Sequence, residues 1–192
     1  MSYAILRFAH FIGLTLMGAG LLGVFLTDLR SRQLQDLALF TEAVRNIAVF
    51  YDGLVVPGAL LLLGSGTVLI VDLYGWDFLT FPWLAGMVGL FAFEFIEGNT
   101  VTRLYFLRLR RLARAALDKG RVTPELESAR REHIPTFTHF LDLPILFVIV
   151  SLGAMRPDGW STLAISVSIA VFVAICFTLV LPRLYPWQPS VN

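Results

Sequence analysis

Five long apolar stretches follow one another along the chain, and they restrict its possible folds more than any other feature. A helix needs roughly 20 residues to cross about 30 Å of hydrocarbon. Backbone groups in lipid must be hydrogen-bonded within their own segment, and the alternating pattern of a membrane barrel is absent, so the stretches should be helices. The predicted transmembrane segments are about 4–27, 52–73, 82–106, 136–155 and 161–182.

The composition excludes a soluble domain of this size. Of the 192 residues, 57% are hydrophobic and 15% are charged, whereas soluble domains have about 45–50% and about 25%. A globule this small could not remove so much apolar surface from water. The sequence therefore predicts an all-α fold, a polytopic bundle of five transmembrane helices forming one membrane domain over residues 1–192. The expected location is the bacterial cytoplasmic (inner) membrane, with multiple passes.

The positions of the basic residues predict the orientation of these helices. Cytoplasmic loops are enriched in Lys and Arg. If the loops 28–51 and 107–135 and the end of the chain are cytoplasmic, thirteen of the fifteen Lys and Arg residues lie inside, counting Arg103 at the inner end of the third span. The two short connections on the other side carry Trp76, Trp83 and Trp160, as expected at a membrane interface. The prediction is an N-terminus outside and a C-terminus in the cytoplasm.

The two inner loops are expected to be helical. The third span should continue as a basic helix to about Leu117 and end near Gly120, a residue type that favours helix ends. Thr123, followed by a proline, should begin a short second helix. Residues 29–50 have the apolar stripe of an interfacial helix. The basic side chains are expected to face anionic lipid or a protein partner rather than nucleic acid: Arg103, Arg108, Arg110, Arg111 and Arg114.

Glycines mark the faces on which the first two spans should pack. Small residues let membrane helices approach closely, which increases van der Waals contact. This pattern predicts helix packing and indicates no chemistry. The residues are Gly13, Gly18, Gly20 and Gly23 in the first span and Gly53, Gly58, Gly64 and Gly66 in the second.

Ionisable residues inside the predicted spans are the candidates for function, because such groups are costly in a bilayer. Glu94 and Glu97 are three apart and share a helix face, as do His139 and Asp142. The topology places Asp52 at a similar depth. We expect these five side chains to form a polar intramembrane cluster. It could be a proton relay, a metal or cofactor-anchoring site, or a hydrogen-bonded clamp between helices, and no metal ligand is assigned.

His10 lies about two turns into the first span and is a candidate axial ligand of haem iron. The alternative is a hydrogen bond to a neighbouring helix. By rise per residue, His139 should lie on the order of 15 Å deeper, so the two histidines are not expected to share one iron. A haem at His10 would need another partner, such as Met17 or Met87, or an open sixth position.

Three stretches of the chain carry a family resemblance over roughly residues 4–157. They are Arg7-Phe-Ala-His10-Phe-Ile-Gly13, then Asp52-Gly-Leu-Val-Val-Pro57-Gly58, and last Ile134-Pro135 with Asp142-Leu-Pro144 and Met155-Arg-Pro157. Together they resemble a family of bacterial integral membrane proteins that looks distantly related to the CopD copper-resistance domain and to HemJ, the membrane protoporphyrinogen oxidase. The resemblance implies haem b at His10. The Asn-Glu-x-Pro stretch of HemJ has no counterpart at Glu132-His133-Ile134-Pro135.

Three functions follow from these features. The first is a haem b-binding redox or electron-transfer protein of the CopD/HemJ type. The second is a non-catalytic accessory subunit of a larger respiratory or photosynthetic membrane complex, or a homo-oligomer. The third is a small metal or proton-coupled transporter. Nucleotide-binding and hydrolase motifs are absent, and the sequence leaves open whether the chain is an enzyme.

Overall fold

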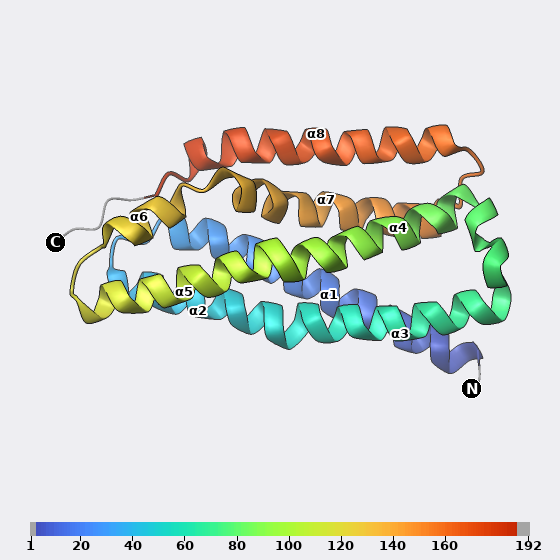
Figure 1. Cartoon of the computed structure of the whole chain (residues 1–192), viewed down its shortest axis with the longest axis horizontal. Helices are drawn as coiled ribbons and strands as arrows, with labels where there is room; N and C mark the ends of the chain where they lie inside the picture. The colour runs from blue at the N-terminus through green and yellow to red at the C-terminus, as the bar shows by residue number, and fades with distance from the viewer. Residues whose placement is uncertain (1–2, 188–192) are drawn as a thin grey trace.

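The computed structural model describes residues 3–187, in which every regular element is a helix (Figure 1). Turn-like helical segments are labelled η. The elements are α1 (Tyr3–Arg32), α2 (Leu37–Phe50), η1 (Tyr51–Val55), α3 (Val56–Leu73), η2 (Gly75–Thr80), α4 (Pro82–Glu97), η3 (Gly98–Thr102), α5 (Arg103–Asp118), α6 (Pro124–Arg130), α7 (His133–Met155) and α8 (Trp160–Leu184).

Five helices of the described chain are long and apolar enough to cross a membrane, which confirms the predicted fold class. The second is longer than predicted, and the third continues to Asp118 as expected; each joins two α-helices end to end through a π-helical turn. α2, η1 and α3 form one rod over Leu37–Leu73, and α4, η3 and α5 form another over Pro82–Asp118. Residues 29–50 are therefore divided between the end of α1, a short turn and the first part of a long rod.

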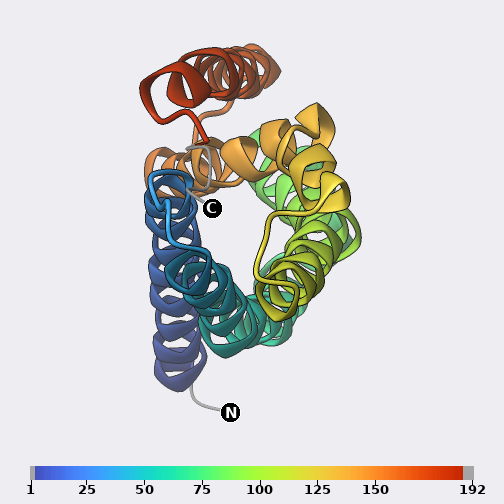
Figure 2. The ribbon, with the colours of Figure 1, turned by 90° about the vertical axis from the view of Figure 1, so that its left-hand side faces the viewer.

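Four of the five long helices enclose the interior of the bundle (Figure 2). α1 packs along α3 and also contacts α7, and α7 packs against α4. The two long rods meet through α2 and α5, which closes the ring. α8 packs mainly against α7 on the outside, so it takes no part in enclosing the centre.

The lengths of the helices place the bilayer on this bundle. Trp76 and Trp83 lie at the end where η2 joins the two rods, and Trp favours the membrane interface. About 20 helical residues cover about 30 Å, so a bilayer that begins at Pro82 ends close to Thr102. α2, α5 and α6 then extend beyond it as a helical extension, the α6 end of the molecule. The inside orientation of that end stays a prediction.

The extension has its own core and ordered helix ends. Phe40, Leu109 and Leu126 are fully buried in it. The chain leaves α5 through Gly120, whose φ of +65° is favourable for glycine, and the Thr123 side chain caps α6 by accepting a hydrogen bond from the Leu126 N–H. Both features confirm the predicted end of the basic helix and the start of the next one.

Glycines bring α1 and α3 into backbone contact, as the small-residue pattern predicts. A Cβ atom added at Gly58 would lie 2.5 Å from the Met17 backbone nitrogen and 2.8 Å from the Gly13 carbonyl oxygen. Gly13 and Gly20 face α3 and η1 equally closely. By contrast, Gly53 and Gly64 have open space where a Cβ would stand, so they do not contribute to this interface.

Candidate functional site: a buried row of titratable side chains

Four of the five predicted intramembrane polar residues lie inside the ring. Glu94 and Glu97 from α4 and His139 and Asp142 from α7 are each no more than 8% exposed. Glu94, Glu97 and Asp142 are close enough for their charges to interact. The spacing of three along each helix thus directs both pairs into the same interior.

Asp52 lies apart from these four. Its carboxylate accepts two hydrogen bonds from the Arg103 guanidinium, at 2.9 and 3.0 Å, and the side chains are 46% and 38% exposed. The pair links the two long rods where they leave the bilayer. A half-exposed pair at this boundary has a structural explanation, and it is not part of the buried group.

Asp28 is a member of the buried group that the sequence did not indicate. It is 1% exposed and accepts a hydrogen bond from Arg32 Nε at 3.0 Å, one turn further along α1. Its Oδ2 lies 3.9 Å from His139 Nε2, and His139 Nδ1 lies 3.8 Å from Asp142 Oδ2. The only sequence signal was an acid four residues before an arginine, which is also typical of a solvated helix end.

These contacts form a row that runs from the α6 end into the membrane. In order, its members are Arg32, Asp28, His139 and Asp142, and beside the inner end stand Glu97 and Glu94. The last of them lies twelve residues from Pro82, hence about 18 Å from the start of that helix. Beyond the row, towards η2, α4 and α7 pack through apolar side chains, among them Leu84, Ile145 and Leu152. The row therefore ends inside the bundle and does not reach the η2 end.

Several polar atoms of the row have no hydrogen-bond partner among the described residues. Glu97 accepts a hydrogen bond from the Thr102 hydroxyl at 2.8 Å. In contrast, one oxygen of Glu94, both oxygens of Asp142 and both ring nitrogens of His139 are buried without a partner. Burying such atoms costs free energy, so their retention indicates a ligand, a proton or water in this place.

Aromatic side chains surround His139. The rings of Phe106, Phe140 and Phe25 have centroids 5.1, 5.3 and 6.3 Å from that of the imidazole. They keep bulk water away from the middle of the row. Charge interactions between its members are correspondingly stronger than they would be in water.

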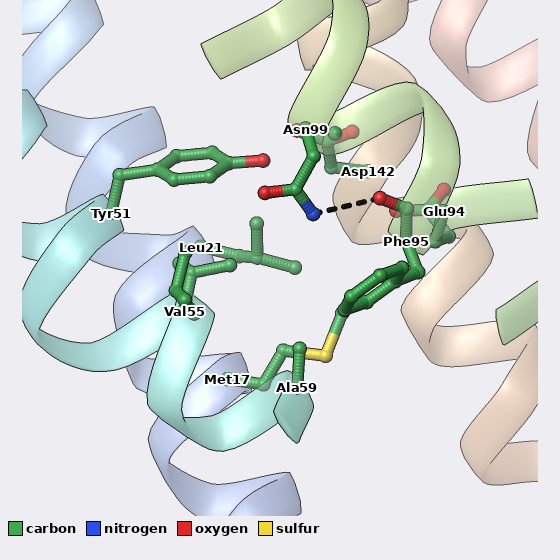
Figure 3. A pocket seen from close by; sticks show the side chains of 11 residues that line it. Met17, Leu21, Tyr51, Val55, Ala59, Glu94, Phe95, Asn99 and Asp142 are labelled. Carbon is green, nitrogen blue, oxygen red and sulfur yellow. Dashed lines mark hydrogen bonds between the residues drawn. The ribbon is translucent and has the colours of Figure 1, made fainter. Parts of the chain in front are cut away.

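A small cavity lies beside the inner end of the row (Figure 3). Its volume is about 20 Å³, and Glu94 and Asp142 form part of its wall. Tyr51 and Gly98, the first residues of the two π-helical turns, face it from the two long rods. Figure 3 shows the Tyr51 hydroxyl directed toward Asn99. π-Helical turns are rare and are frequent at functional sites, and here two of them meet at one cavity.

The α6 end of the row is closed by the segment that follows α8. The indole N–H of Trp187 donates a hydrogen bond to the Arg130 carbonyl oxygen at 2.8 Å. The guanidinium carbons of Arg32 and Arg130 lie 4.8 and 5.2 Å from the centre of a Trp187 ring. Trp187 thereby covers the arginine with which the row begins.

His10 lies far along α1 from this row and faces α3. Its Nδ1 is 3.1 Å from the Ser65 hydroxyl oxygen, and its ring fills the space beside Gly66. The imidazole is half-buried. Its hydrogen bond to a neighbouring helix matches the packing alternative, and a haem at this position stays a prediction.

The arginines predicted to face lipid or a protein partner lie on α5. Arg108 pairs with Glu132 at 2.6 Å, and three further arginines of α5 are exposed, namely Arg110, Arg111 and Arg114. Within residues 3–187, no group of three or more His, Cys, Asp or Glu side chains is arranged to hold a metal ion.

Comparison with known proteins places the chain in a family. A family model described as a predicted integral membrane protein, DUF2269, matches residues 4–157. The matched region includes α1 to α7 and every member of the row. No curated protein and no solved structure matches the chain. The chain belongs to the DUF2269 family of predicted integral membrane proteins.

Proposed function

We propose that this protein is a proton-coupled membrane protein whose buried row of titratable side chains takes up protons from the α6 end and holds them near Glu94. The carrying observation is the pair of short separations, 3.9 and 3.8 Å, that leads from Asp28 through His139 to Asp142, while Arg32 holds Asp28 in place by a hydrogen bond of 3.0 Å. Titratable chains inside membrane proteins are typical of proton relays.

The distances indicate how protons would move. The two contacts of His139 are longer than hydrogen bonds, which have heavy-atom separations of about 2.7–3.2 Å. A proton therefore passes only when the imidazole shifts by about 1 Å or when a water bridges the gap. A neutral imidazole can accept a proton on one ring nitrogen and release the proton that its other ring nitrogen carries. This chemistry suits His139 to the central position.

The row reaches only part of the way through the bilayer. Its apolar end, packed with the side chains around Leu152, blocks protons from the η2 end. A passive channel would need polar groups on both sides. A row that reaches only one end favours a protein that couples protonation of Glu94 and Asp142 to a helix movement that opens the η2 end, so that protons cross the bilayer without a continuous channel.

The test is proton flux in liposomes that contain the purified full chain and a pH-sensitive dye inside. A potassium gradient with valinomycin drives protons inward. The wild type should acidify the lumen, and Asp142→Asn and Glu94→Gln should abolish the flux. Asp52→Asn is the matched control, because it changes a carboxyl outside the row. Flux that is equal in all four proteins would refute the proposal.

A second candidate function is a haem b-binding redox protein of the CopD/HemJ type, with His10 as an axial ligand. The observation that favours it is the hydrogen bond between His10 Nδ1 and Ser65, because such a partner fixes the ring and leaves Nε2 available. An absorption spectrum of the purified protein should then show a Soret band that is lost in His10→Ala. A spectrum without visible bands would remove this candidate.

A further inference from the structure

The wall of the small cavity contains more hydrogen-bond acceptors than donors. Glu94 and Asp142 contribute buried carboxyl oxygens without partners. Asn99 donates its amide N–H to the Phe95 carbonyl oxygen at 2.8 Å, which leaves its side-chain oxygen as an acceptor. The groups of the wall that can donate are the Tyr51 hydroxyl and the second amide N–H of Asn99, which are fewer than the acceptors.

A neutral water molecule cannot compensate the negative charge of this wall when the Glu94 and Asp142 carboxyls are both ionised. A cavity of about 20 Å³ has room for one water molecule, since about 10–15 Å³ is enough. One water offers two hydrogens and no charge, whereas two buried carboxylates carry two negative charges. A cation or bound protons must therefore compensate them.

The size and the ligands of the cavity restrict which cation fits. Ca²⁺ takes six to eight oxygen ligands, and Mg²⁺ keeps several of its waters. The cavity offers side-chain oxygens from four residues and space for one water-sized particle. The charged ligands are carboxylate oxygens, which favour hard cations, although the wall also contains the Met17 side chain. A monovalent cation of the size of Na⁺ meets both restrictions.

We propose that the cavity between η1 and η3 binds one dehydrated monovalent cation, Na⁺, in exchange for protons on Glu94 and Asp142. This inference rests on the proposed function, because the same carboxyls bind both ions. It identifies the second ion to which proton uptake is coupled.

The charged groups around the cavity support an exchange of this kind. From α4 come Glu94 and Glu97, and from α7 come Asp142 and, behind it, His139. Asp28 and Arg32 of α1 form a pair on the far side of His139 and nearly cancel in charge. Arg103 lies on the outside, paired with Asp52, and Tyr51 contributes a neutral hydroxyl. The charged groups nearest to the cavity are thus carboxyls, which favour binding of a cation.

The π-helical turns explain why the hydroxyl reaches the cavity. A Cβ atom at position 98 would lie 2.6 Å from the Tyr51 hydroxyl oxygen. Glycine at the start of η3 therefore provides the space in which that hydroxyl stands. Gly98→Ala should displace the hydroxyl and weaken cation binding while retaining both carboxyls.

The experiment measures the thermal unfolding midpoint of the purified full chain in detergent, in NaCl, KCl or choline chloride at equal ionic strength. Na⁺ should raise the midpoint over choline, with a rise that saturates, because a ligand that binds only the folded state stabilises it. If one proton competes, the Na⁺ concentration for half the rise should increase about tenfold for each pH unit of acidification. Identical midpoints in Na⁺ and choline would overturn the inference, as would a larger rise with CaCl₂ or MgCl₂.

Variants separate the cation site from general stability. Tyr51→Phe and Asn99→Ala each remove one neutral oxygen and keep the carboxyls, so they should shift the Na⁺ titration to higher concentration. Glu42→Gln, in an exposed pair with Arg45, should leave it unchanged. Shifts of equal size in all three variants would contradict the site.

The same preparations distinguish failure of this inference from failure of the proposed function. Proton flux in liposomes without any Na⁺ effect on stability would overturn the cation site and retain the proton row. A saturable Na⁺ effect without proton flux would retain the site as a cation site and overturn its coupling to protons.

Discussion

Replacing Gly58 by alanine should separate α1 from α3 and destabilise the bundle. The added Cβ would stand 2.5 Å from the Met17 nitrogen, 2.8 Å from the Gly13 carbonyl oxygen and 3.0 Å from the Met17 Cα. All three atoms belong to the backbone, so no side chain can rotate away. Ordinary carbon contacts are about 3.5–4.0 Å, and relief therefore requires the helices to move apart by on the order of 1 Å.

This geometry implies a loss of folding free energy in Gly58→Ala. Overpacking of a well-packed interior costs about 1–3 kcal/mol, which corresponds to a change of about 5- to 150-fold in the folding equilibrium. The backbone contacts leave little room for relaxation, so we expect the upper half of that range. Separation of α1 from α3 would also loosen the contact between Gly20 and Val55 one turn along, adding to the loss.

The assay is equilibrium unfolding in mixed micelles of a mild and a denaturing detergent, followed by circular dichroism. Gly64→Ala is the matched control on the same helix, because a Cβ there meets nothing within 4 Å. It should be neutral or stabilising by up to about 1 kcal/mol, the helix propensity difference between glycine and alanine. Equal stabilities for Gly58→Ala and Gly64→Ala would refute the proposed close approach of α1 and α3.

Two further predictions concern the α6 end. Trp187→Ala removes a hydrogen bond and two cation–π contacts and should release the segment after α8 at a cost of about 1–3 kcal/mol. Limited proteolysis should then cleave this segment faster. An unchanged cleavage rate would contradict the contact. Hydrogen bonds from its own backbone and from Thr123 hold the pKa of the exposed Glu125 carboxyl below its ordinary value, so its stabilising effect is present near neutral pH and is lost as the pH falls through that lowered pKa. Thr123→Ala should raise the pKa in an NMR titration, whereas an unchanged pKa would show that the side chain of Thr123 plays no part.

Apolar length and helix-end chemistry made most of the fold predictable. The five spans follow from uninterrupted hydrophobic stretches, and the end of α5 follows from Gly120. The sequence did not reveal that α2 and α3 form one rod. The prediction separated an interfacial helix over residues 29–50 from a span that begins at 52, but the π-helical turn at Tyr51–Val55 lets the helix continue through Pro57. A widened turn relieves the missing N–H and the steric conflict that proline brings to a regular helix.

The same π-helical turn explains why Asp52 lies outside the buried group that it was predicted to join. Neighbouring helical residues point about 100° apart, and an extra residue in a turn shifts the face again. Tyr51 consequently faces the interior, while Asp52 faces outward toward Arg103. Asp28 escaped notice for another reason: beside two arginines at the end of a span, it resembles a solvated helix terminus. Asp28 is buried because the fold covers that end of α1, which the sequence does not show.

The proposed function requires that the buried carboxyls of the row exchange protons with water from the α6 end. Infrared difference spectroscopy of the reconstituted protein after a pH jump tests it most directly, because the C=O stretch of a protonated carboxyl stands apart from that of a carboxylate. We expect carboxyl difference bands that disappear in Asp142→Asn or Glu94→Gln and persist in Glu42→Gln. A difference spectrum that is the same in wild type, Asp142→Asn and Glu94→Gln would show that these carboxyls do not exchange protons, and it would contradict the account.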